Sequence, residues 1–124
     1  AFAIQNWYQF ESTVFVSNIV NSRFDNCIFY GNGANEIDVD TLMGTTMEFE
    51  FNACLMKREE PYNYSNYSPS VQWNIDPLFI NPLEDDFHLS EGSPLKDAGD
   101  PGFSNATDIE GTVRTTPAIG LYEL

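Results

Sequence analysis

Four aromatic side chains in and beside one polar loop have the types and spacing that best suit ligand binding. Tyr62, Tyr64 and Tyr67 lie in a segment rich in Asn, Ser and Pro, and Trp73 follows it. Sugar rings stack on exposed aromatic faces, and loops on a rigid scaffold commonly carry specificity. The cluster therefore predicts a glycan-binding site, and packing of the rings onto the protein itself is the alternative.

Acidic residues are plentiful, but their spacing does not predict a catalytic pair. Inverting glycoside hydrolysis needs two carboxylates roughly 6.5–9.5 Å apart across a cleft. The nearest local candidate is the Asp85-Asp86 doublet, whose sequence context is typical of a solvated turn. A lyase would need a base that takes a proton, and the only adjacent basic residues are Lys57 and Arg58. We therefore predict no catalytic residue, with a remnant of a polysaccharide lyase or hydrolase as the minor alternative.

Carboxylates at alternate positions are the best local candidates for holding a metal ion. Glu36, Asp38 and Asp40 would face one way on a strand, and Ca²⁺ prefers such oxygen ligands. The glycine of a calcium loop is missing, so a solvated acidic face is preferred and Ca²⁺ binding remains the alternative. His88 is the only histidine. We predict no metal ligand set and no cofactor.

Charge and composition exclude several classes of protein. The 124 residues include 19 Asp and Glu against 5 Lys and Arg, which gives a formal net charge of −14. Nucleic-acid binding needs clustered basic residues, and an anionic membrane surface would repel this chain. Hydrophobic residues make up 42% of the chain, enough for a core, yet no apolar run reaches the roughly 18 residues of a membrane span. The chain is expected to be one folded domain that neither binds nucleic acid nor inserts into a membrane.

Strand patterns and an internal repeat predict an all-β solenoid. Met47, Phe49 and Phe51 alternate with polar residues, whereas no helical periodicity is present. Residues 20–32 align with residues 47–59 at a constant offset of 27, which matches aromatic, cysteine and aliphatic positions in the two copies. A polar bend within each copy lets two strands point inward. Stacked coils of this kind describe a parallel β-solenoid; an antiparallel sandwich is the alternative.

The two cysteines occupy equivalent positions of the two copies. Cys27 and Cys54 are separated by the repeat offset, and neither has a second Cys or a His two to four residues away. We expect both to face the interior of adjacent coils as free thiols, because stacked side chains in register point the same way.

The remainder of the chain differs in composition. Residues 1–75 carry the coil pattern, whereas Asp76–Leu124 is punctuated by Pro and Gly. The last coil of a solenoid exposes strand edges and apolar side chains that need a cover. We therefore predict that residues 76–124 form an irregular C-terminal cover segment over the final coil, within a single domain 1–124.

Ordered motifs in this segment carry a family resemblance. They are Asp76-Pro77-Leu78-Phe79-Ile80-Asn81, Asp86-Phe87-His88-Leu89, Gly92-Ser93-Pro94, Asp97-Ala98-Gly99, Asp108-Ile109-Glu110-Gly111, Arg114 and Ile119-Gly120-Leu121-Tyr122-Glu123. Together with Asn26-Cys27-Ile28-Phe29-Tyr30-Gly31-Asn32 upstream, the chain resembles the C-terminal portion of the bacterial β-helix repeat proteins of choice-of-anchor Q type. The resemblance implies a right-handed parallel β-helix of the pectate-lyase-like superfold, secreted or displayed on a bacterial cell surface. Ala118 stands where that family usually has an Asp.

These observations lead to one functional expectation with alternatives. The chain is expected to be a non-catalytic, secreted or cell-surface β-helix module that binds a polysaccharide. A structural stalk or spacer, as a fragment of a larger surface protein, is the main alternative. The apolar residues within 1–20 begin the coil at once, so we expect self-association through the uncapped N-terminal end.

Overall fold

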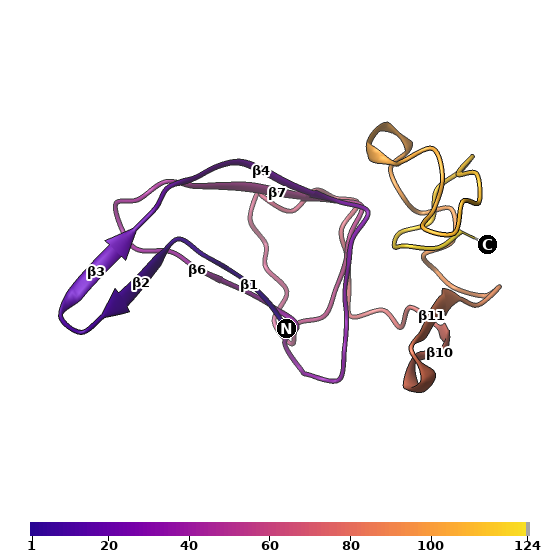
Figure 1. The fold of residues 1–124 in the computed structure, drawn as a ribbon, viewed down its shortest axis with the longest axis horizontal. Coiled ribbons are helices and arrows are strands. Elements are labelled where there is room, and N and C mark those ends of the chain that lie inside the picture. The colour runs from indigo at the N-terminus through magenta and orange to yellow at the C-terminus, as the bar shows by residue number, and fades with distance from the viewer. Residues whose placement is uncertain (124) are drawn as a thin grey trace.

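The computed structural model describes residues 1–123 and consists of short strands joined by loops (Figure 1). The only helices in this range are two 3-10 turns, η1 (Pro82–Glu84) and η2 (Pro101–Phe103). The all-β class predicted from the alternating pattern is therefore confirmed.

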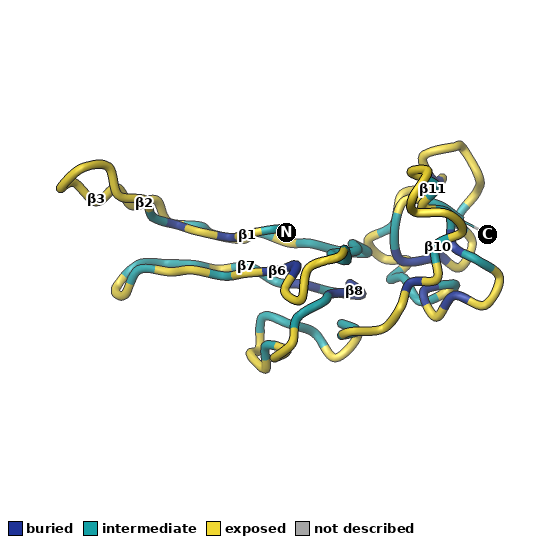
Figure 2. Tube along the Cα trace, turned by 90° about the horizontal axis from the view of Figure 1, so that it is seen from below, coloured by how far each residue is buried: buried dark blue, intermediate teal, exposed yellow. Residues whose placement is uncertain are grey.

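Seven strands form three small parallel sheets. The first pass of the chain contributes β1 (Phe2–Gln5), β4 (Ile19–Asp25) and β5 (Ile28–Phe29). The second contributes β6 (Ile37–Asp40), β7 (Met47–Asn52) and β8 (Leu55–Met56), and β9 (Gln72–Trp73) follows them. β1 pairs with β6, β4 with β7, and β5 with β8, which also pairs with β9. Figure 2 shows the two passes as two layers.

The internal repeat aligned in the sequence corresponds to this pairing. Phe24 lies opposite Phe51, so from Ser22 onward the strands of the two copies pair in parallel at the 27-residue offset. Before Ser22 an irregularity shifts the register, so that Ile19 and not the predicted Val20 lies opposite Met47. The bend predicted inside each copy is also present, because Asn26 and Ala53 have φ angles of 54° and 46°. Asn tolerates this left-handed conformation, whereas Ala adopts it at a cost of roughly 1–2 kcal/mol. Parallel pairing of the copies does not fit the antiparallel sandwich that was the alternative.

A column of stacked aromatic rings runs through both passes. The ring of Phe24 lies 4.8 Å from that of Phe51, which lies 5.3 Å from Tyr67. Tyr62 continues the column at 5.6 Å from Tyr67. Tyr62 and Tyr67 come from the loop between β8 and β9, so this loop covers the second pass on the side away from the first.

An antiparallel hairpin projects from the first pass. β2 (Trp7–Phe10) and β3 (Thr13–Val16) pair only with each other and point away from the C-terminal segment (Figure 1). Every residue of β3 is exposed.

The C-terminal segment packs on the side of the passes. Its own strands, β10 (Phe79–Asn81) and β11 (Asp86–Leu89), form an antiparallel hairpin, and the rest is irregular. Leu89, Leu95 and Ile119 form a second core with Leu55, whose neighbours in sequence, Cys54 and Met56, face the first core. The segment therefore covers the outer face of the β5–β8–β9 sheet.

This placement differs from the predicted cover over the final coil. Of the apolar residues expected in that cover, Leu78 and Phe87 are 41% and 42% exposed, whereas Leu89 is buried and Phe79 packs against the second core. The physical reason is that Ile28 and Leu55 make the outer face of the β5–β8–β9 sheet apolar, so this face also needs a cover. The end of the second pass is instead covered by the loop between β8 and β9 that carries Tyr62, Tyr64 and Tyr67, which we call the aromatic loop.

Candidate functional site

The structure brings together all four residues of the predicted glycan site. Besides the column contacts of Tyr62 and Tyr67, Trp73 lies 5.4 Å from Tyr67, and Tyr64 lies 5.9 Å from Tyr62. Tyr67 is stacked between Phe51 and Tyr62, so both faces of its ring are covered. Burial raises the pKa of Tyr67. This ring belongs to the core and cannot offer a face to a sugar.

The outer part of this cluster remains accessible. Tyr64 is 66% exposed. Tyr62 is half-buried; its hydroxyl donates to Asp38 Oδ1 at 3.1 Å, and the Arg58 guanidinium lies 4.2 Å from the centre of its ring. Burial first, and then the bond to Asp38, raise the pKa of Tyr62. Only Tyr64 therefore presents a largely open ring, which is a small platform for a ligand.

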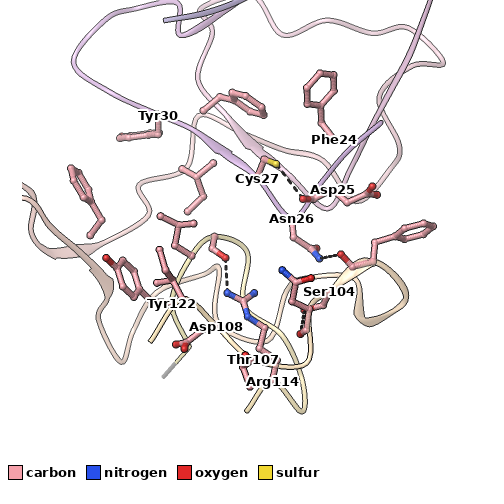
Figure 3. Close-up of a pocket in the computed structure, with 18 of the residues that line it drawn as sticks. Phe24, Asp25, Asn26, Cys27, Tyr30, Ser104, Thr107, Asp108, Arg114 and Tyr122 are labelled. Carbon is pink, nitrogen blue, oxygen red and sulfur yellow. Dashed lines mark hydrogen bonds between the residues drawn. The ribbon is translucent and has the colours of Figure 1, made fainter. Parts of the chain in front are cut away.

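A groove that local sequence patterns did not reveal lies between the first pass and the C-terminal segment (Figure 3). Its volume is about 840 Å³, within the range of ligand sites, ~300–1,000 Å³. Aromatic side chains on its walls come from both parts of the chain: Phe24, Phe29, Tyr30, Phe79, Phe87, Phe103 and Tyr122. Polar lining residues are Asp25, Asn26, Ser104, Asn105, Thr107, Asp108 and Arg114. The groove thus combines apolar ring surface with amides, hydroxyls and carboxylates.

The groove is formed because the bend between β4 and β5 binds the C-terminal segment. Asn26 Nδ2 donates to the carbonyls of Asp100 and Phe103, at 3.0 and 3.3 Å. Its Oδ1 accepts from the Asp100 amide at 2.7 Å, and its carbonyl accepts from the Gly120 amide at 3.0 Å. Both polar atoms of this side chain are therefore used to build the wall of the groove.

The charged groups of the groove are largely satisfied within the protein. The hydrogen bond from Arg23 lowers the pKa of Asp25. The Glu123 amide, followed by other backbone amides, lowers the pKa of Asp108. Arg114 donates to the carbonyls of Ala118 and Gly120 and lies 3.5 Å from Glu123. Because the two lining carboxylates are ionised and the guanidinium is engaged elsewhere, the groove does not favour an anionic ligand.

Two polar side chains of the groove remain free for a ligand. Asn105 and Thr107 are exposed, and neither side chain hydrogen-bonds to any residue within 1–123. Phe87 and Phe103 are also partly open, with 42% and 52% exposure. The available surface is therefore aromatic and neutral polar.

The alternating carboxylates do not meet at a common point. Glu36 accepts from the Gly33 amide and pairs with the terminal amine of Ala1 at 3.1 Å. Asp38 accepts from the Tyr62 hydroxyl, and Asp40 accepts from a glutamine amide of β1. In the part of the chain that the structure describes, no cluster of three or more His, Cys, Asp or Glu could hold a metal ion.

The remaining candidates for chemistry have structural partners. His88 Nδ1 lies 2.6 Å from Asp86, its Nε2 lies 3.1 Å from Glu110, and its ring stacks on Tyr122 at 3.9 Å. Asp85, the other member of the acidic doublet, caps η1 with a left-handed backbone. These contacts hold the β10–β11 hairpin to the rest of the C-terminal segment.

Comparisons with known proteins add no assignment. No protein-family model, curated protein or solved structure matches this chain. Across residues 1–123, no helix has the length and apolar character needed to cross a bilayer. The resemblance to the choice-of-anchor Q proteins thus rests on the sequence motifs alone.

Proposed function

We propose that the two passes are coils of a right-handed parallel β-helix of the pectate-lyase-like superfold. The parallel pairing of successive passes, the 27-residue offset that β4 from Ser22 and β5 keep with β7 and β8, and the stacked interior rings support this assignment. The proposal includes the choice-of-anchor Q family and a secreted or cell-surface location, both of which depend on the motifs quoted above.

We further propose that the chain is a non-catalytic module that binds a neutral polysaccharide in the groove beside the β4–β5 bend. The observation that carries this proposal is the groove of about 840 Å³ with aromatic rings on both walls and free amide and hydroxyl groups between them. Sugars present C–H faces that pack on aromatic rings and hydroxyls that bond to neutral polar groups. A net charge of −14 disfavours a polyuronate, because like charges repel.

Affinity electrophoresis against neutral and uronate polysaccharides tests the proposal. Phe87→Ala removes an exposed ring of the groove, and we expect it to weaken retardation by a neutral polymer by about tenfold or more. Tyr64→Ala removes the most exposed ring of the aromatic loop and should leave binding unchanged. Leu83→Ala, at a 91% exposed apolar position outside the groove lining, is the matched control.

Each other outcome has a defined meaning. Loss of binding in Tyr64→Ala alone would keep glycan recognition and move the site back to the loop of Tyr62, Tyr64, Tyr67 and Trp73. Absence of binding to every polymer would favour the structural stalk or spacer. Cleavage of a polymer by the wild-type chain would overturn the non-catalytic assignment.

A further inference from the structure

The β2–β3 hairpin is the most exposed apolar element of the chain, and it is not used by the proposed glycan site. It projects from the body at the end remote from the C-terminal segment (Figure 1). Each of its strands has one partner only, so each has an open edge. A two-stranded ribbon of this kind is marginally stable in water unless something packs against it.

One face of this hairpin is aromatic. Tyr8 lies opposite Phe15 and Phe10 lies opposite Thr13, so these four side chains share a face of the ribbon. Tyr8, Phe10 and Phe15 are 59%, 66% and 43% exposed. The rings of Tyr8 and Phe15 stack at 4.9 Å with an interplanar angle of 9°, which gives the face a flat, preorganised surface.

The apolar area is large for such a short element. Val14 and Val16 on the opposite face are 47% and 46% exposed, and nearby Val20 is 54% exposed. The three rings of the aromatic face alone expose on the order of 300 Å², comparable to the largest apolar patch on a typical monomer. A stable interface buries about 800 Å² from each partner, so this face supplies the apolar centre of the contact and residues beside the hairpin supply the rest.

Charge distribution identifies the occupant. Residues 6–18 contain a single charged side chain, Glu11, although the whole chain carries −14. Two copies of the chain can therefore approach with the least electrostatic repulsion through this element. An anionic membrane has no such advantage, because its charge faces the entire acidic molecule.

We propose that the β2–β3 hairpin is the docking surface for a second copy of this chain. The aromatic faces of two hairpins pack on each other about a two-fold axis, so that each Phe10 lies against the partner's ring surface. Such an isologous contact closes after two copies and does not propagate. The self-association expected from residues 1–20 is thereby assigned to one element of that segment.

Sedimentation velocity of the whole chain at low and moderate ionic strength tests this proposal. We expect a concentration-dependent dimer of twice 14.0 kDa that tightens as salt is added, because salt screens the repulsion between the acidic bodies. Phe10→Glu should weaken the dimer by about tenfold or more, since it places a charge within the buried contact. Leu83→Glu adds the same charge at an exposed apolar position in the C-terminal segment and should leave the dimer unchanged.

A second variant separates loss of contact from loss of folding. Thr13→Glu lies on the same face and is already exposed, so it should weaken the dimer even if Phe10→Glu destabilises the hairpin. A monomer at both ionic strengths, or a dimer that neither hairpin variant weakens, would overturn the proposal. A chain that stays monomeric but floats with phosphatidylcholine vesicles would also overturn the proposal, because the hairpin would then bind a lipid surface and not a second copy.

Discussion

Replacing Phe51 by Ala removes the ring at the centre of the aromatic column. This side chain is fully buried, and its ring is stacked between those of Phe24 and Tyr67. The rings of Phe29 and Phe49 each lie 5.6 Å from it in edge-on contact. Deletion would therefore leave a cavity walled by four aromatic rings, within the layer that joins the two passes.

The expected cost follows from how little this cavity can collapse. A buried Phe→Ala substitution generally destabilises by about 3–5 kcal/mol. The backbone here is bonded to the aromatic loop, because the Phe51 amide donates to Asn66 at 2.7 Å and its carbonyl accepts from Ser68 at 2.9 Å. These bonds hold the walls apart, so the upper half of that range applies. The free energy of unfolding of a domain is only about 5–15 kcal/mol, so such a loss is a large fraction of its stability.

Urea unfolding followed by tryptophan fluorescence measures this effect. Phe24→Ala should cost less, about 2 kcal/mol, because Phe24 is only half-buried. Glu48→Ala, on the exposed face of the same strand as Phe51, should change stability by no more than about 0.5 kcal/mol. If Phe51→Ala does not fold, Phe51→Leu provides a milder test, with an expected loss of about 1–2 kcal/mol.

The ranking of the variants decides the test. A Phe51→Ala variant that unfolds at the same urea concentration as Glu48→Ala would refute the assignment of an inner and an outer face to β7. A Phe24→Ala variant that is less stable than Phe51→Ala would refute the order of the column.

Thiol reactivity and pH provide two further tests. The hydrogen bond to Cys27, together with burial, raises the pKa of the Cys54 thiol, so a thiol reagent should react slowly with half-buried Cys27 and not with Cys54 until the protein is denatured. An oxidised pair would contradict the free-thiol prediction. Hydrogen bonds to Asp86 and Glu110 raise the pKa of His88, so their stabilisation is present below ~6.5 and is lost as the pH rises through the raised pKa. The same contact lowers the pKa of Asp86, so this contribution is present above ~3.9 and is lost as the pH falls through the lowered pKa. Thermal melts should therefore show the largest difference between wild type and His88→Gln in mildly acidic solution, and equal differences at every pH would disprove the ion pair.

The pairing of β4 with β7 could be predicted from the sequence because these strands are long enough to show a pattern. Met47, Phe49 and Phe51 alternate over six residues of β7, and the series Phe51, Cys54, Leu55 has its equivalent one repeat earlier in Phe24, Cys27, Ile28. The bend could also be predicted, since Phe24 and Cys27 are three residues apart and a straight strand cannot point both inward.

The packing of the C-terminal segment could not be predicted in this way. β5 and β8 have only two residues each, which is too short to show which face is apolar. Ile28 and Leu55 could therefore not be recognised as an outward-facing pair. The aromatic residues of the loop were correctly grouped, but the spacing of Tyr62 and Tyr67 could not show that they continue a column begun by Phe24.

The groove could not be predicted because its two walls are distant in sequence. Asn26, which joins them, already had an explanation as the residue of the bend between β4 and β5. Asn26 fits the bend through its tolerance of a left-handed backbone, and that was reason enough for its presence. Ala53 occupies the equivalent bend of the second pass with a similar φ, so the conformation does not by itself require an amide side chain. The difference lies in the partners: the Ala53 amide donates to Ser70 Oγ, whereas Asn26 binds Asp100 with both ends of its side chain. The asparagine of the first pass therefore makes most of the bonds that attach the C-terminal segment, and Asn52, beside Ala53 in the second bend, adds a hydrogen bond from its Nδ2 to Asp100 Oδ2 at 2.8 Å.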